Sequence, residues 1–76
     1  MKIIQSPFKE SFEIGSIISL FPLSGKVEGI TTKGLKYPLK NESLENGIRD
    51  GSSNKAVEET IEIKFKKGDL LLLTHH

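Results

Sequence analysis

Side chains that could do chemistry are few in this sequence, and most of them are neutral. The chain has no cysteine, its two histidines are the terminal His75 and His76, and its aspartates are Asp50 and Asp69. Nucleophilic catalysis needs a histidine that neighbouring groups orient, and a magnesium–nucleotide site needs carboxylates that converge on one ion. The sequence therefore predicts no catalytic residue and no metal site. Whether the two histidines are native or the remnant of a purification tag stays open.

The segment from Gly51 to Lys55 is the best candidate for a binding site. Its serine hydroxyls and its asparagine amide are neutral donors and acceptors, which suit the polar edge of a heterocycle. Ser53 and Asn54 are therefore candidate ligand contacts, and the alternative is that they only shape a loop or cap a helix. Tyr37, the single tyrosine of the chain, could stack on a flat ring, and its alternative is packing at the rim of a core.

Charge and hydropathy exclude several classes of protein. Of 76 residues, 11 are Lys or Arg and 10 are Asp or Glu, which gives a formal net charge of +1. This balance argues against a basic nucleic-acid clamp, and no apolar run approaches the ~20 residues of a membrane helix. The first five residues are too short and polar for a signal peptide. We expect a cytoplasmic protein with no nucleic-acid or membrane partner.

Apolar residues alternate with polar ones along most of the chain, and glycines interrupt the alternation. Period-two alternation places one face of a strand on a core. Val57, Ile61, Ile63 and Phe65 are expected on such a face, whereas the continuous run Leu70–Leu73 predicts a strand covered on both faces. The pattern predicts strands over residues 8–14, 17–21, 27–32, 35–39, 57–65 and 70–73.

Three details of this pattern carry further expectations. Pro38 lacks an N–H, so the strand around it is expected at a sheet edge, and Gly29 inside a strand indicates a bulge or a close backbone approach. Residues 40–56 are mostly polar; Leu44 and Ile48 could anchor a short strand or a turn, and residues 51–54 give the strongest loop signal. A helix over residues 54–60 is rejected, because the alternation from Val57 onward favours a strand.

These features predict an all-β fold: an antiparallel β-sandwich, or a small jelly-roll-like barrel, of seven to eight short strands in a single domain over residues 1–76. The core is expected to be marginal. Hydrophobic residues make up 36% of the chain, and a domain of this size buries only about 60% of the surface that its unfolded chain exposes. We therefore expect a partner subunit or a further domain to contribute to its stability.

The order of motifs resembles the C-terminal, thiamine-binding domain of thiamine pyrophosphokinase, from about Phe8 to Leu73. No single motif carries the resemblance; the ordered set does. Its members are Ser19–Ser24 (SLFPLS), Val27–Leu39 (VEGITTKGLKYPL), Ser53-Asn54 and Gly68–Leu72 (GDLLL), and the run from Gly34 to Leu44 (GLKYPLKNESL) is the most specific.

The resemblance implies a division of labour between two domains. Enzymes of this family transfer a pyrophosphoryl group from ATP to the hydroxyethyl oxygen of thiamine, and the products are thiamine diphosphate and AMP. It implies that an α/β domain, which this chain lacks, binds ATP and Mg²⁺ through its carboxylates, so that this chain alone binds neither and is not catalytic. It also implies a homodimer, with the thiamine pocket between the β-sandwich of one subunit and the α/β domain of the other.

By the same resemblance, Ser53 and Asn54 are expected to bind thiamine, Tyr37 is the aromatic residue beside it, and Pro22 and Leu23 line the pocket. An alternative of another class is a stand-alone, non-catalytic β-sandwich that senses a ligand or binds another protein. A substantial coding region upstream of Met1 would favour the enzyme, and tight ligand binding by the isolated chain would favour the alternative.

Overall fold

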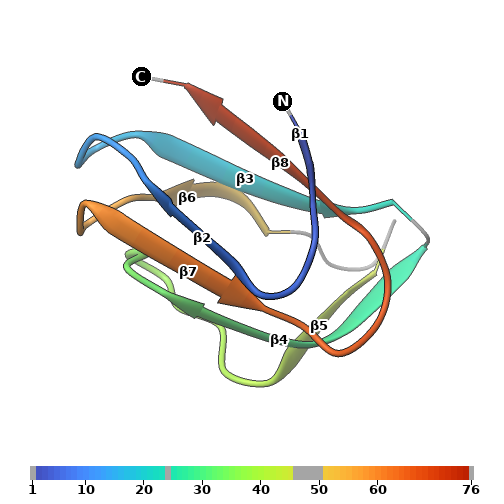
Figure 1. Cartoon of the computed structure of the whole chain (residues 1–76). Helices are drawn as coiled ribbons and strands as arrows, with labels where there is room; N and C mark the ends of the chain where they lie inside the picture. The colour runs from blue at the N-terminus through green and yellow to red at the C-terminus, as the bar shows by residue number, and fades with distance from the viewer. Residues whose placement is uncertain (1, 24, 46–50, 76) are drawn as a thin grey trace.

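The computed structural model of the chain describes residues 2–23, 25–45 and 51–75, which form eight β-strands and no helix. Figure 1 shows their arrangement. The strands are β1 (Lys2–Ile4), β2 (Phe8–Ser11), β3 (Ile17–Pro22), β4 (Lys26–Lys33), β5 (Glu42–Glu45), β6 (Gly51–Lys55), β7 (Thr60–Lys64) and β8 (Leu70–His75).

The strands form two four-stranded antiparallel sheets, with the orders β1-β8-β3-β6 and β2-β7-β4-β5. The chain passes from one sheet to the other at most connections, so strands far apart in sequence are hydrogen-bonded neighbours (Figure 1). This architecture confirms the predicted antiparallel β-sandwich. No helix among the described residues has the length and apolar character needed to cross a membrane.

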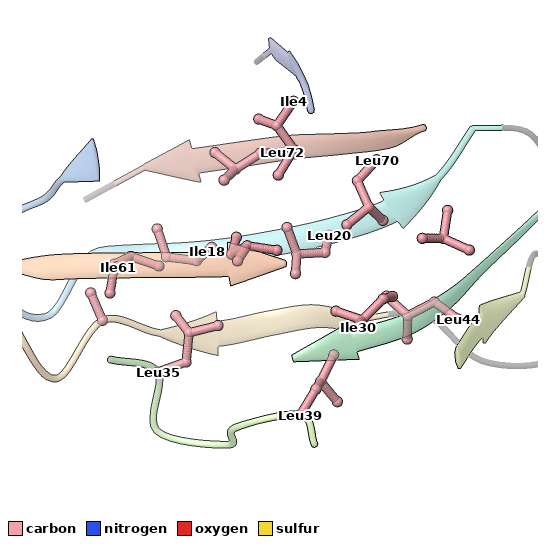
Figure 2. Packing of buried hydrophobic residues seen from close by; sticks show 13 residues of the cluster. Ile4, Ile18, Leu20, Ile30, Leu35, Leu39, Leu44, Ile61, Leu70 and Leu72 are labelled. Atoms are coloured by element: carbon pink, nitrogen blue, oxygen red, sulfur yellow. The ribbon is translucent and has the colours of Figure 1, made fainter. Parts of the chain in front are cut away.

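The core lies between the two sheets, and thirteen buried apolar side chains of the described residues belong to it (Figure 2). Ile61 and Ile63 are fully buried on the predicted face of β7. Full burial of a leucine or isoleucine side chain contributes about 1.5–3 kcal/mol of transfer free energy, so this layer is the main source of stability. The members are Ile4, Ile18, Leu20, Val27, Ile30, Leu35, Leu39, Leu44, Ala56, Ile61, Ile63, Leu70 and Leu72.

The outward faces of the two sheets differ in chemistry. On the sheet of β2, β7 and β4, the residues Lys9, Glu62 and Lys33 lie opposite one another across the three strands. On the sheet of β1, β8 and β3, the corresponding row is Ile3, Leu71 and Phe21. We use the name apolar outer face for this row together with Ile17 and Leu73, which lie on the same side of the sheet.

The expectation that residues 70–73 are covered on both faces was wrong. Leu70 and Leu72 are fully buried, but Leu71 and Leu73 are only half-buried, because the described residues supply no third layer over this side of the sheet. His75 pairs with Ile17 at the end of β8, so the structure places it in the strand and not in a frayed tail.

Two predicted strands are shorter in the structure, and both end where the chain changes sheets. The strand predicted over residues 57–65 is β7, which begins at Thr60, and Val57 is exposed. The strand predicted over residues 8–14 ends at Ser11, and Ile14 is 63% exposed because a turn follows, closed by the bond from the Ser16 N–H to the Glu13 carbonyl (3.0 Å). Phe8, Phe12 and Phe65 pack only partly buried against the core.

Three further expectations fail, and backbone pairing is the reason in each case. Residues 35–39 form no strand, although Leu35 and Leu39 are buried. Residues 51–54, the strongest loop signal, belong to β6, because pairing with β3 imposes a strand on a polar segment. The short strand β1 was not predicted; it pairs with β8, and its Lys2 ammonium group forms an ion pair with Glu10 of β2 at 2.7 Å.

Other local predictions are confirmed. Leu44 is fully buried and anchors the short strand β5, whereas Ile48 lies outside the described residues. Residues 54–60 form no helix. The register of β4 against β5 shifts between Val27 and Ile30, as expected from Gly29. Gly29 has a φ of +66°, a conformation that favours glycine, and a Cβ there would lie 2.7 Å from Cγ and Cδ of Lys66, whose exposed side chain would have to shift.

A substitution at Gly34 tests how tightly the β4 end packs on β7. An alanine Cβ there would lie 2.6 Å from the Thr60 carbonyl oxygen, at a φ of +92°. We expect Gly34→Ala to lose about 1–2 kcal/mol to backbone strain and about 1–3 kcal/mol more to overpacking. The control is Gly15→Ala, which has a similar φ of +96° but nothing within 4 Å of the added atom. Urea unfolding measures both, and equal losses would contradict the packing argument.

Candidate functional site

Two of the predicted site residues, Tyr37 and Asn54, lie close to a point where three segments of chain meet around Ala56. The Ala56 N–H donates to the Ser16 carbonyl (2.9 Å), and the Ala56 carbonyl accepts from the Gly15 N–H (2.8 Å). On the other side, Ala56 forms a β-bridge with Leu35. This residue therefore joins the β2–β3 turn to the segment that follows β4, at the left-hand end of the sandwich in Figure 1.

Asn54 is buried and holds the backbone of Tyr37. Its Oδ1 accepts a hydrogen bond from the Tyr37 N–H at 3.0 Å, and its Nδ2 donates to the Tyr37 carbonyl at 2.8 Å. The same Oδ1 accepts from the N–H of Lys55 at 2.9 Å. Asn54 retains only 8% exposure. Its carboxamide thus takes the place of a strand neighbour for a residue that belongs to no strand.

The segment of residues 34–41, which we call the tyrosine loop, is held in the same manner along its length. Every N–H from residue 36 to residue 41 is bonded, apart from Pro38, which has none. The acceptors are the Lys55 carbonyl for Lys36 (2.8 Å), Asn54 Oδ1 for Tyr37 (3.0 Å), Thr32 Oγ1 for Leu39 (2.9 Å), Glu42 Oε2 for Lys40 (3.1 Å) and Thr31 Oγ1 for Asn41 (3.1 Å).

Tyr37 projects from this firmly held loop into solvent. Its side chain is 62% exposed, although its neighbours Leu35 and Leu39 are buried in the core. The Lys36 ammonium group lies over the Tyr37 ring, 5.4 Å from the centroid, which is cation–π distance. An exposed aromatic ring on a fixed backbone is a surface on which a flat ligand can stack. With 62% of the side chain exposed, Tyr37 is not packed in the core.

The structure brings some of the expected residues together and separates others. Ser53 precedes Asn54 in β6, at the edge of its sheet, and the structure describes only its backbone. Pro22 and Leu23 lie at the opposite end of β3 from Ile18, the residue that pairs with Asn54. The structure therefore does not place Pro22 and Leu23 beside Tyr37.

Sequence reasoning missed Thr31 and Thr32, which bind the tyrosine loop through their hydroxyl groups. The sequence does contain a pattern that could have indicated this role. Two adjacent threonines stand at the end of a predicted strand just before a glycine turn, and threonine hydroxyls often bind nearby backbone groups. Sequence reasoning also did not place the Lys36 ammonium group over the Tyr37 ring. The partners of these residues depend on the path of the loop, which the sequence pattern did not reveal.

A surface hollow of about 610 Å³ lies beside the β2–β3 turn. Its lining combines an aromatic ring and an aliphatic side chain with two carboxylates: Ser11, Phe12, Glu13, Ile14 and Glu59. In the described parts of the chain, no three histidine, aspartate or glutamate side chains gather closely enough to hold a metal ion.

Comparison with known proteins places the chain beside enzymes of vitamin metabolism. The model of the family described as "Thiamin pyrophosphokinase, vitamin B1 binding domain" matches residues 4–70. The crystal structure of thiamine pyrophosphokinase from Bacillus subtilis is similar to 96% of this chain, with a TM-score of 0.84 and 27% identity. A search of curated proteins found no match.

A second solved structure shares the fold. The thiamin pyrophosphokinase of Geobacillus thermodenitrificans is similar to 93% of this chain with a TM-score of 0.83 and 23% identity. The matched regions cover 35% of the Bacillus subtilis protein and 34% of the Geobacillus thermodenitrificans protein. The chain thus spans about one third of the length of these two relatives.

The hydroxyl contacts of the tyrosine loop can be tested by an isosteric substitution. Thr32→Val leaves the Leu39 N–H without its acceptor in a buried position, and we expect a loss of about 1–3 kcal/mol in the free energy of unfolding. Thr31→Val is the matched control: its partner, the Asn41 N–H, is exposed, so water replaces the lost acceptor and the loss stays below about 1 kcal/mol. Urea unfolding of both variants measures these losses. A Thr32→Val midpoint equal to that of Thr31→Val would refute the role of Thr32 in holding the tyrosine loop.

Proposed function

The chain belongs to the thiamin pyrophosphokinase vitamin B1 binding domain family, and on this basis we propose that it provides the thiamine site of a thiamine pyrophosphokinase. In the proposed reaction the hydroxyethyl oxygen of thiamine attacks the β-phosphorus of ATP. The bond from that phosphorus to the oxygen bridging to the α-phosphate breaks, AMP leaves, and the hydroxyl proton passes to a base. The products are thiamine diphosphate and AMP.

The catalytic groups of this reaction are proposed to lie outside this chain. An α/β domain would bind ATP and Mg²⁺, since the described residues of the sandwich offer no set of metal ligands. The ion would neutralise phosphate charge there. The contribution of the sandwich is to hold thiamine in one orientation, so that its hydroxyl lies in line with the reacting phosphorus.

The proposed thiamine site consists of Tyr37 with Ser53 and Asn54. The observation that carries it is the exposed Tyr37 ring, held on a loop whose N–H groups are bonded. Thiamine has a cationic thiazolium ring and a neutral aminopyrimidine. Because the Lys36 ammonium group lies over one face of Tyr37, we expect a cationic ring to stack on the opposite face, where cation–π attraction is worth about 0.5–2 kcal/mol.

One exposed aromatic wall does not exclude water from a small ligand. Tyr37 leaves 62% of its surface in solvent, so a second wall is needed for stacking and hydrogen bonds to act in a desolvated pocket. The α/β domain of a partner subunit would supply that wall. The proposed protein is therefore a homodimer that works in the cytoplasm, where its substrates ATP and thiamine meet.

We further propose that the homodimer forms through the apolar outer face of the β-sandwich. Ile3 is 63% exposed on this face, and Phe21 and Leu71 are half-buried beside it. The charged row Lys9, Glu62 and Lys33 makes the outer face of the other sheet unsuitable for such burial. A two-fold axis over the apolar outer face would bury the same residues from both copies.

A domain exchange tests the proposed function. The matching third of the Bacillus subtilis enzyme is replaced by this chain, and formation of AMP and thiamine diphosphate is measured. In this chimera we expect Tyr37→Ala to weaken thiamine binding about 2- to 30-fold, Tyr37→Phe to keep it, and Ser53→Ala to weaken it several-fold. Calorimetry gives the affinities. An inactive chimera that is folded, or unchanged affinity in Tyr37→Ala, would count against the proposal.

A charge placed on the apolar outer face tests the dimer. Leu71→Lys would bring two ammonium groups together across a two-fold axis, and we expect the dimer to dissociate at least about tenfold more readily. The control Thr60→Lys adds the same charge at an exposed position of β7 on the other sheet. Sedimentation equilibrium over a range of concentrations gives the dissociation constants. Equal constants for the two variants would exclude this face as the interface.

A further inference from the structure

The Asn54 side chain has almost no hydrogen-bonding capacity left for a ligand. An asparagine carboxamide accepts two hydrogen bonds at its oxygen and donates two from its nitrogen. The oxygen of Asn54 accepts from the N–H groups of Tyr37 and Lys55, and its nitrogen donates to the Tyr37 carbonyl. The amide orientation is settled by chemistry, because both backbone N–H groups require an oxygen acceptor. At most one N–H of the carboxamide remains.

We propose that Asn54 is a positioning residue that acts on the ligand through Tyr37. The inference rests on the proposed function only for the identity of the ligand. Asn54 is 8% exposed, whereas Tyr37 is 62% exposed, so the residue that meets solvent is the one that Asn54 holds. Its two reciprocal bonds fix the peptide groups on both sides of the Tyr37 Cα atom.

Fixing these peptide groups fixes the direction in which the ring leaves the backbone. The residue before Tyr37 is tied as well, since the Lys36 N–H donates to the Lys55 carbonyl at 2.8 Å. The residue after it is Pro38, which restricts Tyr37 itself to an extended conformation. Only the two side-chain torsions of Tyr37 stay free, so little entropy is lost when a ligand stacks on the ring.

The chain provides its own probe for this inference. It contains one tyrosine and no tryptophan, so its tyrosine emission comes from Tyr37 alone. Time-resolved anisotropy of this emission measures the nanosecond mobility of the ring. Amide hydrogen exchange of the Tyr37 N–H measures how often its bond to Asn54 opens. Neither measurement requires thiamine.

In Asn54→Ala we expect the amplitude of fast Tyr37 motion to rise and the Tyr37 amide to exchange about tenfold faster. The control is Thr31→Val, which releases the Asn41 N–H of the same loop and should leave Tyr37 unchanged. Asn54→Asp offers a conservative rescue: a neutral carboxylic acid can donate to the Tyr37 carbonyl as the amide does, but a carboxylate cannot. Its Tyr37 should be ordered at low pH and mobile at neutral pH.

The direction of this pH dependence follows from the structure. A carboxylate at position 54 would face the Tyr37 carbonyl oxygen, which the Asn54 Nδ2 contacts at 2.8 Å, whereas its other oxygen would still accept from the Tyr37 and Lys55 N–H groups. Ionisation of the introduced acid therefore removes the bond to the Tyr37 carbonyl and replaces it with repulsion. Order at Tyr37 is therefore present while the introduced acid is neutral, and it is lost as the pH rises through the pKa of that acid. The wild-type chain and Asn54→Ala, scanned over the same range, account for the other titrating groups.

A double-mutant cycle in the chimera separates positioning from direct contact. If Asn54 acts through Tyr37, Asn54→Ala weakens thiamine binding when Tyr37 is present and has no further effect in Tyr37→Ala. Additive losses, or unchanged Tyr37 mobility in Asn54→Ala, would overturn the inference. If the unmodified chimera binds no thiamine, the proposed function fails, whereas the mobility and exchange measurements on the chain still decide whether Asn54 positions Tyr37.

Discussion

The burial of one face of each sheet against the other is the constraint from which the rest of this structure follows. Thirteen apolar side chains fill the space between the sheets, and they come from both sheets and from the tyrosine loop. A chain of this size has too few residues to cover a second face as well. Every feature outside that layer must therefore be stabilised by hydrogen bonds, by solvent or by a partner.

The tyrosine loop shows how hydrogen bonds meet this need. Leu35 and Leu39 insert into the core and fix the loop at both ends, whereas the residues between them lie outside any sheet. Buried or half-buried N–H groups left without acceptors would be costly. Asn54, Thr31 and Thr32 provide side-chain acceptors in place of a neighbouring strand. The result is an irregular loop with the backbone order of a sheet and an aromatic ring on its outer side.

The outer faces of the two sheets are stabilised in different ways: one by solvent, and the other, in the proposed function, by a partner. A row of charged residues on β2, β7 and β4 is well solvated, whereas the apolar outer face of β1, β8 and β3 leaves Ile3, Phe21 and Leu71 partly exposed to water. Contiguous exposed apolar surface commonly marks an interaction site. A domain with an exposed aromatic ring at one end and an apolar face on one sheet is suited to act as part of a larger assembly, as the proposed function requires.

The sequence by itself determined the all-β class, the inward face of β7 at Ile61 and Ile63, the bulge at Gly29, and the family. These follow from local alternation and from an ordered set of motifs, both of which can be read along the chain. Tertiary structure alone decided that the polar residues 51–55 form an edge strand, that residues 35–39 do not, and that Asn54 pairs with Tyr37. The alternation of apolar and polar residues shows which side chains can face a core. It does not record which backbone groups find partners across 17 residues of chain, because those partners are set by the packing of the two sheets.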